Sequence, residues 1–226
     1  MSSGYFLNAS EFPIEKFKHI IQNKDLLPAR LALRLNIDQN FDILISNGIN
    51  SLGDLSDALK TKIKIAKFAK KTGFDLDYLT LLRREANSYL PLPVKLSEFS
   101  IMDLKTAFQL ELMGIINSKH FFMKAHKKAE RQKLAEEYRL KYERLTELVQ
   151  LCDLVRITGV GTIFAKLIYD AGYQSVSEFI SYDSTIILEK LYETNNQNQH
   201  TRVKFTLSDI EYCIEYAKLL PILLEI

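Results

Sequence analysis

The residues best suited to chemistry in this sequence are two glycines separated by a valine, Gly159-Val160-Gly161. Glycines at such a place permit a tight turn, and they leave backbone N–H groups uncovered where Thr162 begins a stretch with helical spacing of apolar residues. The start of a helix favours an anion, because the peptide dipoles place partial positive charge there. Lys166 lies about one helical turn further on, within reach of the same anion. The pattern predicts a phosphate site.

The segment from Leu154 to Gly172 resembles the helix-hairpin-helix motif, in which a Gly-apolar-Gly turn joins two helices. The resemblance implies contacts with DNA phosphates without readout of the bases. The residues assigned to this contact are Thr158, Gly159, Val160 (as the buried anchor), Gly161, Thr162 and Lys166. The alternative is a hairpin that serves only packing, and the acidic residues that follow, such as Asp170 and Glu178, favour it.

A second basic feature is the run from Lys60 to Lys71, which holds six lysines in twelve residues. On a helix, Ile65, Phe68 and Ala69 would face inward, whereas Lys60, Lys64, Lys67 and Lys71 would share one outer strip. The lysines assigned to nucleic-acid binding are Lys60, Lys62, Lys64, Lys67 and Lys71. Such a surface can neutralise several phosphates and would bind with strong salt dependence and no sequence preference. The alternative is a solvated helix face.

Other kinds of chemistry find little support in the residue pattern. The four histidines are scattered, without the helical spacing of metal ligands, and the two cysteines lie in apolar stripes typical of buried small residues. Local signatures of catalytic triads and of nucleotide-binding loops are absent. We therefore expect no metal, no cofactor and no enzymatic activity. Most Tyr and Phe residues have buried spacing, so no base-stacking platform is predicted.

Composition and charge narrow the class of protein further. The chain has 226 residues, of which 47% are hydrophobic and 26% charged, with a net charge of +2. Residues 1–91 hold 13 basic and 10 acidic residues, residues 92–157 hold 12 and 9, and residues 158–226 hold 5 and 9. Any basic surface must therefore be local and lie in the first two thirds. No stretch is long and apolar enough for a membrane span, and no secretory signal is evident, so we expect a cytoplasmic protein.

Three short stretches of the chain resemble one another around Gly48, Gly114 and Gly172. Each glycine has an apolar residue four positions before it and another seven positions after it. A small polar residue three positions after the glycine is a natural N-cap for a helix; these residues are Ser51, Asn117 and Ser175. The first two copies stay in register without a gap, and the third requires an insertion. Chance similarity between amphipathic helices is the alternative.

The repeats predict an all-α protein with three tandem units of four helices. We expect an N-terminal cap over residues 1–30 and units over residues 31–93, 94–153 and 154–226. The first two units would contain degenerate hairpins, because they lack the glycines of the third.

The arrangement resembles a bacterial-type family of unknown function that is built from helix-hairpin-helix repeats. The resemblance rests on five stretches of the chain, at residues 26–30, 36–41, 58–62, 78–91 and 157–172. It supports the fold and transfers no activity, since fold alone does not determine function.

The sequence thus favours a non-enzymatic module that contacts nucleic-acid phosphates without sequence specificity. The alternative is a helical-repeat module for protein interaction, with a purely structural hairpin. DNA and RNA are not distinguished, and the oligomeric state is left open.

Overall fold

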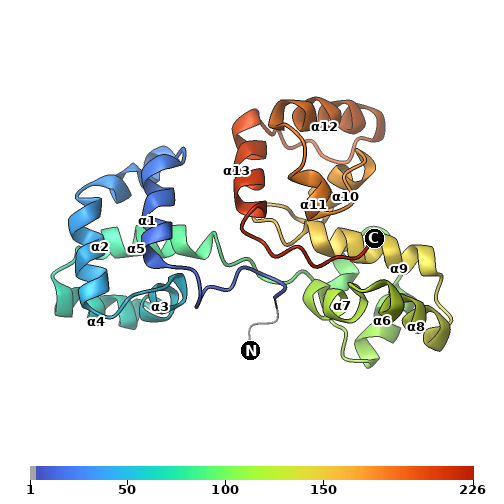
Figure 1. Ribbon diagram of the computed structural model, residues 1–226, viewed down its shortest axis with the longest axis horizontal. Coiled ribbons are helices and arrows are strands. Elements are labelled where there is room, and N and C mark those ends of the chain that lie inside the picture. Colours follow the sequence, from blue (N-terminus) through green and yellow to red (C-terminus); the bar gives the residue numbers. More distant parts are fainter. Residues whose placement is uncertain (1–3) are drawn as a thin grey trace. The chain divides into compact units, whose positions relative to one another are not determined.

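The computed structural model describes residues 4–226, apart from the side chain of Leu104. The described residues form α-helices and short 3₁₀-helices without a β-strand, so the predicted all-α class is confirmed (Figure 1). The chain divides into two compact units. The N-terminal unit comprises residues 7–90, and the C-terminal unit comprises residues 91–226 together with residues 4–6.

The N-terminal unit runs from blue to green in Figure 1. Its helices are α1 (Ile14–Asn23), η1 (Pro28–Arg34), α2 (Ile37–Ser46), α3 (Leu52–Ala58), α4 (Lys62–Thr72) and α5 (Leu76–Asn87). Apolar side chains from every helix meet in its core, among them Phe17, Phe41, Leu55 and Leu82, which are fully buried. Burial of this kind is the main favourable contribution to folding.

The C-terminal unit continues from green to red in Figure 1. Its helices are η2 (Leu96–Glu98), α6 (Leu104–Leu112), α7 (Ser118–Ala125), α8 (Lys128–Tyr138), α9 (Tyr142–Leu154), α10 (Thr162–Asp170), α11 (Val176–Phe179), α12 (Ser184–Asn198) and α13 (Leu207–Ala217). Helix α9 is its centre: it packs against α7, α8 and α10, and eight of its residues are buried. The two ends of the short turn between α9 and α10 are therefore fixed by the core.

Local sequence signals explain where many helices begin. The side chains of Ser51, Asn117 and Ser175 accept hydrogen bonds from backbone N–H groups at the starts of α3, α7 and α11, as their spacing predicts. The glycines three positions earlier all have positive φ, at 86°, 76° and 99°. Each of these helices thus follows a glycine turn and begins at a side-chain cap. Whether the complete four-helix units are equivalent stays a prediction.

The predicted division of the chain has a partial counterpart in the compact units. The boundary between the units follows Leu90, close to the predicted boundary after residue 93. Residues 7–30 belong to the same unit as residues 31–90, whereas residues 4–6 pack with the C-terminal unit. Residues 1–3 of the predicted cap lie outside the described residues. The boundary predicted at 153/154 falls at the end of α9, inside the C-terminal unit.

Candidate nucleic-acid interface

The turn between α9 and α10 has an exposed backbone. Gly159 adopts φ +80°, a conformation that other residues adopt at a cost, and space is open where a Cβ would stand. Gly161 is the N-cap of α10, with φ −84° and ψ 178°, and has no side chain with which to cap the helix. In the described part of the chain, the backbone N–H groups of Thr162 and Ile163 have no acceptor. They are available to an anion.

The remaining residues of the predicted phosphate site have different surroundings. Val160 is buried, as expected for the anchor of the turn. Thr158 is also buried, and its carbonyl oxygen accepts a hydrogen bond from the Cys213 thiol of α13 at 3.7 Å. Of the six predicted residues, Gly159 and Gly161 are exposed at the turn and Thr162 is half-buried.

Lys166 is held by two carboxylates. Its Nζ lies 2.6 Å from Asp170 Oδ1 and 3.2 Å from Glu147 Oε1 of α9. Burial alone lowers the pKa of Lys166, but the hydrogen bonds to Asp170 and Glu147 outweigh it, so the pKa lies above its ordinary value. The other oxygen of Asp170 lies 3.0 Å from His200 Nε2. This face of α10 therefore carries no unpaired positive charge.

A buried ion pair fixes the path of the chain into the turn. Arg156 and Asp153 are paired and almost fully buried. The Arg156 guanidinium also donates to the carbonyl oxygens of Tyr5, at 2.6 Å, and Pro221, at 2.5 Å. Asp153 accepts a hydrogen bond from the backbone N–H of Val176 at 2.7 Å, at the start of α11. Sequence reasoning missed this cluster, although opposite charges three residues apart inside the apolar run 151–157 could have indicated it.

From Lys62 onward the lysine run lies on a helix, α4, as predicted, and Lys60 precedes this helix. Thr61 accepts a hydrogen bond from the N–H of Lys64 and caps the helix. Ile65 and Ala69 are buried, in agreement with the inward face, and Phe68 is half-buried. We call the lysines of this run the α4 lysine surface; it consists of Lys60, just before the helix, and of Lys62, Lys64, Lys67, Lys70 and Lys71 on it, all exposed.

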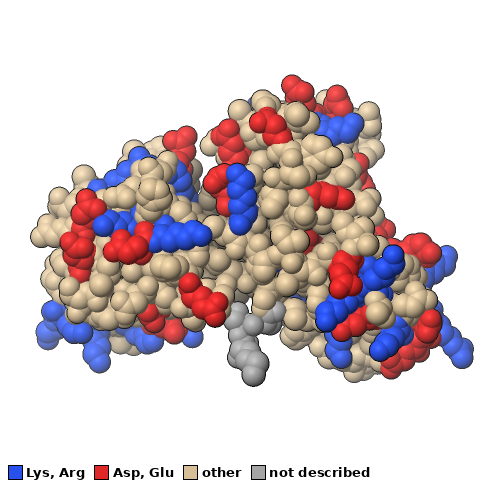
Figure 2. Space-filling model, viewed as in Figure 1, with Lys and Arg blue, Asp and Glu red and all other residues tan. Residues whose placement is uncertain are grey.

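The charges of the α4 lysine surface are largely uncompensated. Lys64 Nζ donates to the carbonyl oxygen of Asp57 at 2.7 Å. Within residues 4–226 no ion pair involves any lysine of this surface. Figure 2 shows Lys and Arg gathered along the edge of the N-terminal unit where α4 lies in Figure 1. The surface differs in this respect from Lys166, whose charge two carboxylates neutralise.

No cluster of three or more His, Cys, Asp or Glu side chains within the described residues could hold a metal ion. No helix of the described residues has the length and apolar character needed to cross a membrane.

Comparison with known proteins identifies a family for this chain. A family model described as a domain of unknown function (DUF4332) matches residues 102–220. The chain belongs to this family. The DUF4332 match spans α6 to α13, including the Gly159–Gly161 turn, and does not include α4. No curated protein and no solved structure matches the chain.

Proposed function

We propose that this protein binds nucleic acid through the phosphate backbone, without reading base sequence, and that it acts as a binding module rather than as an enzyme. The α4 lysine surface carries this proposal. It presents five exposed ammonium groups along one helix of about 16 Å, and that of Lys60 just before the helix begins. Lysines that neutralise phosphates release condensed counterions, which gives affinity without sequence preference.

The Gly159–Gly161 turn is proposed as a second contact, of the helix-hairpin-helix type. Its free N–H groups and open glycine backbone support a role in holding one phosphate oxygen. Lys166 is not part of this contact in the proposal, because Asp170 and Glu147 already bind its ammonium group. The turn would then hold a single phosphate, and the α4 lysine surface would supply most of the affinity.

We also propose that α2–α5, α6–α9 and α10–α13 are tandem repeats related to helix-hairpin-helix units. The glycine turns before α3, α7 and α11 and their three side-chain caps support this relation. In the first two units, the residues at the place of Gly159 and Gly161 are not glycines. Only the third unit would therefore offer open backbone to a phosphate.

The first test is fluorescence anisotropy of labelled duplex and single-stranded DNA with two matched variants. One replaces Lys60, Lys62, Lys67 and Lys71 by Gln. The control replaces Lys124, Lys127, Lys128 and Lys133, which are also exposed and make the same change in net charge. We expect roughly tenfold weaker binding or more for the first variant and much smaller loss for the control. Equal losses would show that only net charge matters and would contradict the proposal.

The Gly161→Asp variant tests the turn separately. Gly161 already has the extended backbone conformation of an N-cap, and Asp is among the best N-cap residues, so the fold should be preserved. The new carboxylate would occupy the place of the phosphate and repel it. We expect weaker nucleic-acid binding with an unchanged helical circular dichroism spectrum. Unchanged binding would remove the turn from the proposed interface and leave the α4 lysine surface.

A specific apolar surface favours protein interaction as the second candidate function. On and after α6, Phe108 is 60% exposed and Leu112 is 74% exposed, and Ile116 follows at 47%. Such a run of exposed apolar side chains is typical of interaction surfaces.

Replacing Phe108 and Leu112 by Ser should leave nucleic-acid affinity unchanged if the first proposal is right. If the wild-type protein binds no nucleic acid at low salt, this second candidate becomes the leading one.

A further inference from the structure

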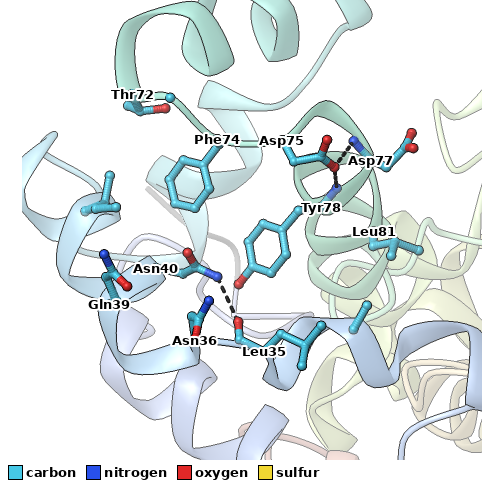
Figure 3. Close-up of a pocket in the computed structure, with 13 residues that line it drawn as sticks. Leu35, Asn36, Gln39, Asn40, Thr72, Phe74, Asp75, Asp77, Tyr78 and Leu81 are labelled. Atoms are coloured by element: carbon cyan, nitrogen blue, oxygen red, sulfur yellow. Dashed lines mark hydrogen bonds between the residues drawn. The ribbon is translucent and has the colours of Figure 1, made fainter.

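A groove opens on the N-terminal unit, between α2 and the turn that joins α4 to α5 (Figure 3). Its volume is about 490 Å³, within the range of small-molecule sites. The residues that define its character are aromatic rings and carboxamides: Phe74, Tyr78, Asn36, Gln39 and Asn40. Figure 3 shows both rings and the Asn40 side chain directed toward the middle of the groove, whereas the Asp77 carboxylate points away from it.

The aromatic rings form a nearly parallel row. Phe68 and Phe74 have ring centres 6.2 Å apart with an 18° angle between the rings, and Phe74 and Tyr78 have centres 5.6 Å apart with a 3° angle. All three side chains are half-buried. Parallel, partly exposed rings are the surfaces on which proteins stack unpaired bases. The row begins on α4, the helix that carries the lysines, and leads into the groove.

Several hydrogen-bonding groups around the rings are unused. Asn36 and Gln39 have no hydrogen-bond partner for their side chains in the described part of the chain, and both are exposed. Asn40 donates its Nδ2 hydrogen to the carbonyl oxygen of Leu35 at 3.0 Å, which leaves its Oδ1 free as an acceptor. The Tyr78 hydroxyl is buried without a hydrogen bond of regular geometry. Burial raises the pKa of Tyr78, and the neighbouring Asn40 amide opposes this.

Carboxamides match the edge of a nucleobase. One carboxamide offers a donor and an acceptor side by side, which is the pattern that amino and ring-nitrogen groups of a base require. The groove therefore combines stacking faces with unused donors and acceptors.

The charges around the groove favour a neutral base inside it and phosphates beside it. Asp75 caps α5 and accepts the N–H groups of Asp77 and Tyr78 at 2.8 and 2.9 Å. The Asp75 carboxylate lines the groove and makes it unfavourable for a phosphate. Lys70 and Lys71 lie in the last turn of α4, next to Thr72, which lines the groove. A neutral base can thus enter the groove while the flanking phosphates meet lysines.

We propose that this groove takes one unstacked base of single-stranded nucleic acid. The contacts with the flanking phosphates depend on the proposed function of the α4 lysine surface. Binding of the base in the groove does not depend on it. Bases of a duplex are paired and stacked, so they are unavailable to the groove. The N-terminal unit should therefore prefer single strands over duplexes.

The test uses a ligand without phosphate and a pair of oligonucleotides. Saturation-transfer NMR with adenosine and cytidine reports on the groove alone, and anisotropy with single-stranded and duplex DNA reports on groove and lysines together. The groove variant is Gln39→Ala with Phe74→Leu. Its control is Asn87→Ala, an exposed carboxamide at the end of α5 outside the groove.

For the wild type and the control we expect saturation transfer to the nucleosides and tighter binding of single strands. The groove variant should lose the transfer and bind single strands about 5-fold more weakly or worse, with duplex binding unchanged. No transfer to either nucleoside in the wild type, or equal transfer in the groove variant, would overturn the proposal. The variant of the α4 lysine surface reports separately on the proposed function, because it should weaken oligonucleotide binding and leave nucleoside binding intact.

Discussion

At the scale of single residues, the buried Arg156–Asp153 pair is the strongest constraint near the proposed interface. Burial raises the pKa of Asp153, and the guanidinium of Arg156 opposes that rise. Arg156 also lies 5.1 Å from the Phe122 ring centre and 5.6 Å from that of Tyr5. A buried guanidinium is tolerated here because each of its three nitrogen atoms donates a hydrogen bond to an oxygen atom, of Tyr5, Asp153 or Pro221.

Replacing Arg156 by Met should therefore be strongly destabilising. The variant leaves the Asp153 carboxylate buried without its partner and removes the hydrogen bonds to two backbone carbonyls. We expect a loss of about 3 to 5 kcal/mol in the free energy of unfolding, measured by urea denaturation with circular dichroism. Arg202→Met is the exposed control and should change it by about 0.5 kcal/mol or less. A loss no larger than the control's would contradict this account.

The two cysteines should be chemically inert in the folded protein. Burial raises the pKa of the Cys213 thiol to about 12, and it raises that of Cys152 as well. The thiolate is the reactive form, so a thiol reagent at about pH 8 should label neither cysteine in the native state and both after denaturation. Rapid labelling of Cys213 in the native protein would show that α13 does not stay packed on Thr158.

At the scale of elements, the two glycines of the turn have different roles. Gly159 needs its positive φ, whereas the φ of Gly161 suits any residue. Gly159→Ala should lower the free energy of unfolding by about 1 kcal/mol or slightly more. Gly161→Ala should be nearly neutral, because space is open at its Cβ position. Thermal melts of the two variants compare these costs, and equal destabilisation would contradict the assignment.

Two helix caps make the stability of the folded protein depend on pH. Asp103 accepts the backbone N–H of Thr106, and Asp183 accepts the hydroxyl and the backbone N–H of Thr185; both pKa values are lowered. The folded state therefore binds these protons less tightly than the unfolded state. Their stabilising effect is present above about pH 4 and is lost as the pH falls through the lowered pKa values.

Asp103→Asn with Asp183→Asn tests this dependence, because Asn also caps helices but does not titrate. Between about pH 7 and about pH 3, the melting temperature of the variant should fall less steeply than that of the wild type. Parallel curves would show that the caps do not contribute to acid sensitivity.

Elements governed by local sequence were predictable, and contacts between distant segments were not. The caps at Ser51, Asn117 and Ser175 follow from residue type and spacing alone. The inward face of α4 follows from helical periodicity. In contrast, the Glu147 carboxylate that binds Lys166 belongs to another helix. The sequence pattern did not reveal this ion pair and therefore predicted that Lys166 contacts a phosphate. The groove likewise brings α2 together with the distant segment 72–81.

At the scale of the whole molecule, the family match and the α4 lysine surface fall on different compact units. DUF4332 covers residues 102–220, in the C-terminal unit, whereas α4 and the groove belong to residues 7–90. Residues 158–226 are acidic, with 9 acidic and 5 basic side chains. Residues 91–226 together hold 17 basic and 18 acidic residues, whereas residues 7–90 hold 13 and 10, so the net positive charge lies in the N-terminal unit.

The most direct test of this account is the salt dependence of nucleic-acid binding by the full chain. The logarithm of the duplex association constant should fall linearly with the logarithm of salt concentration, and four phosphate contacts correspond to a slope of about −3.6. Replacing Lys60, Lys62, Lys67 and Lys71 by Gln should flatten the slope by about 3 to 4, while the control at Lys124, Lys127, Lys128 and Lys133 should retain it. A slope that is the same in the wild type and the α4 variant would contradict the central claim that the α4 lysine surface binds phosphates.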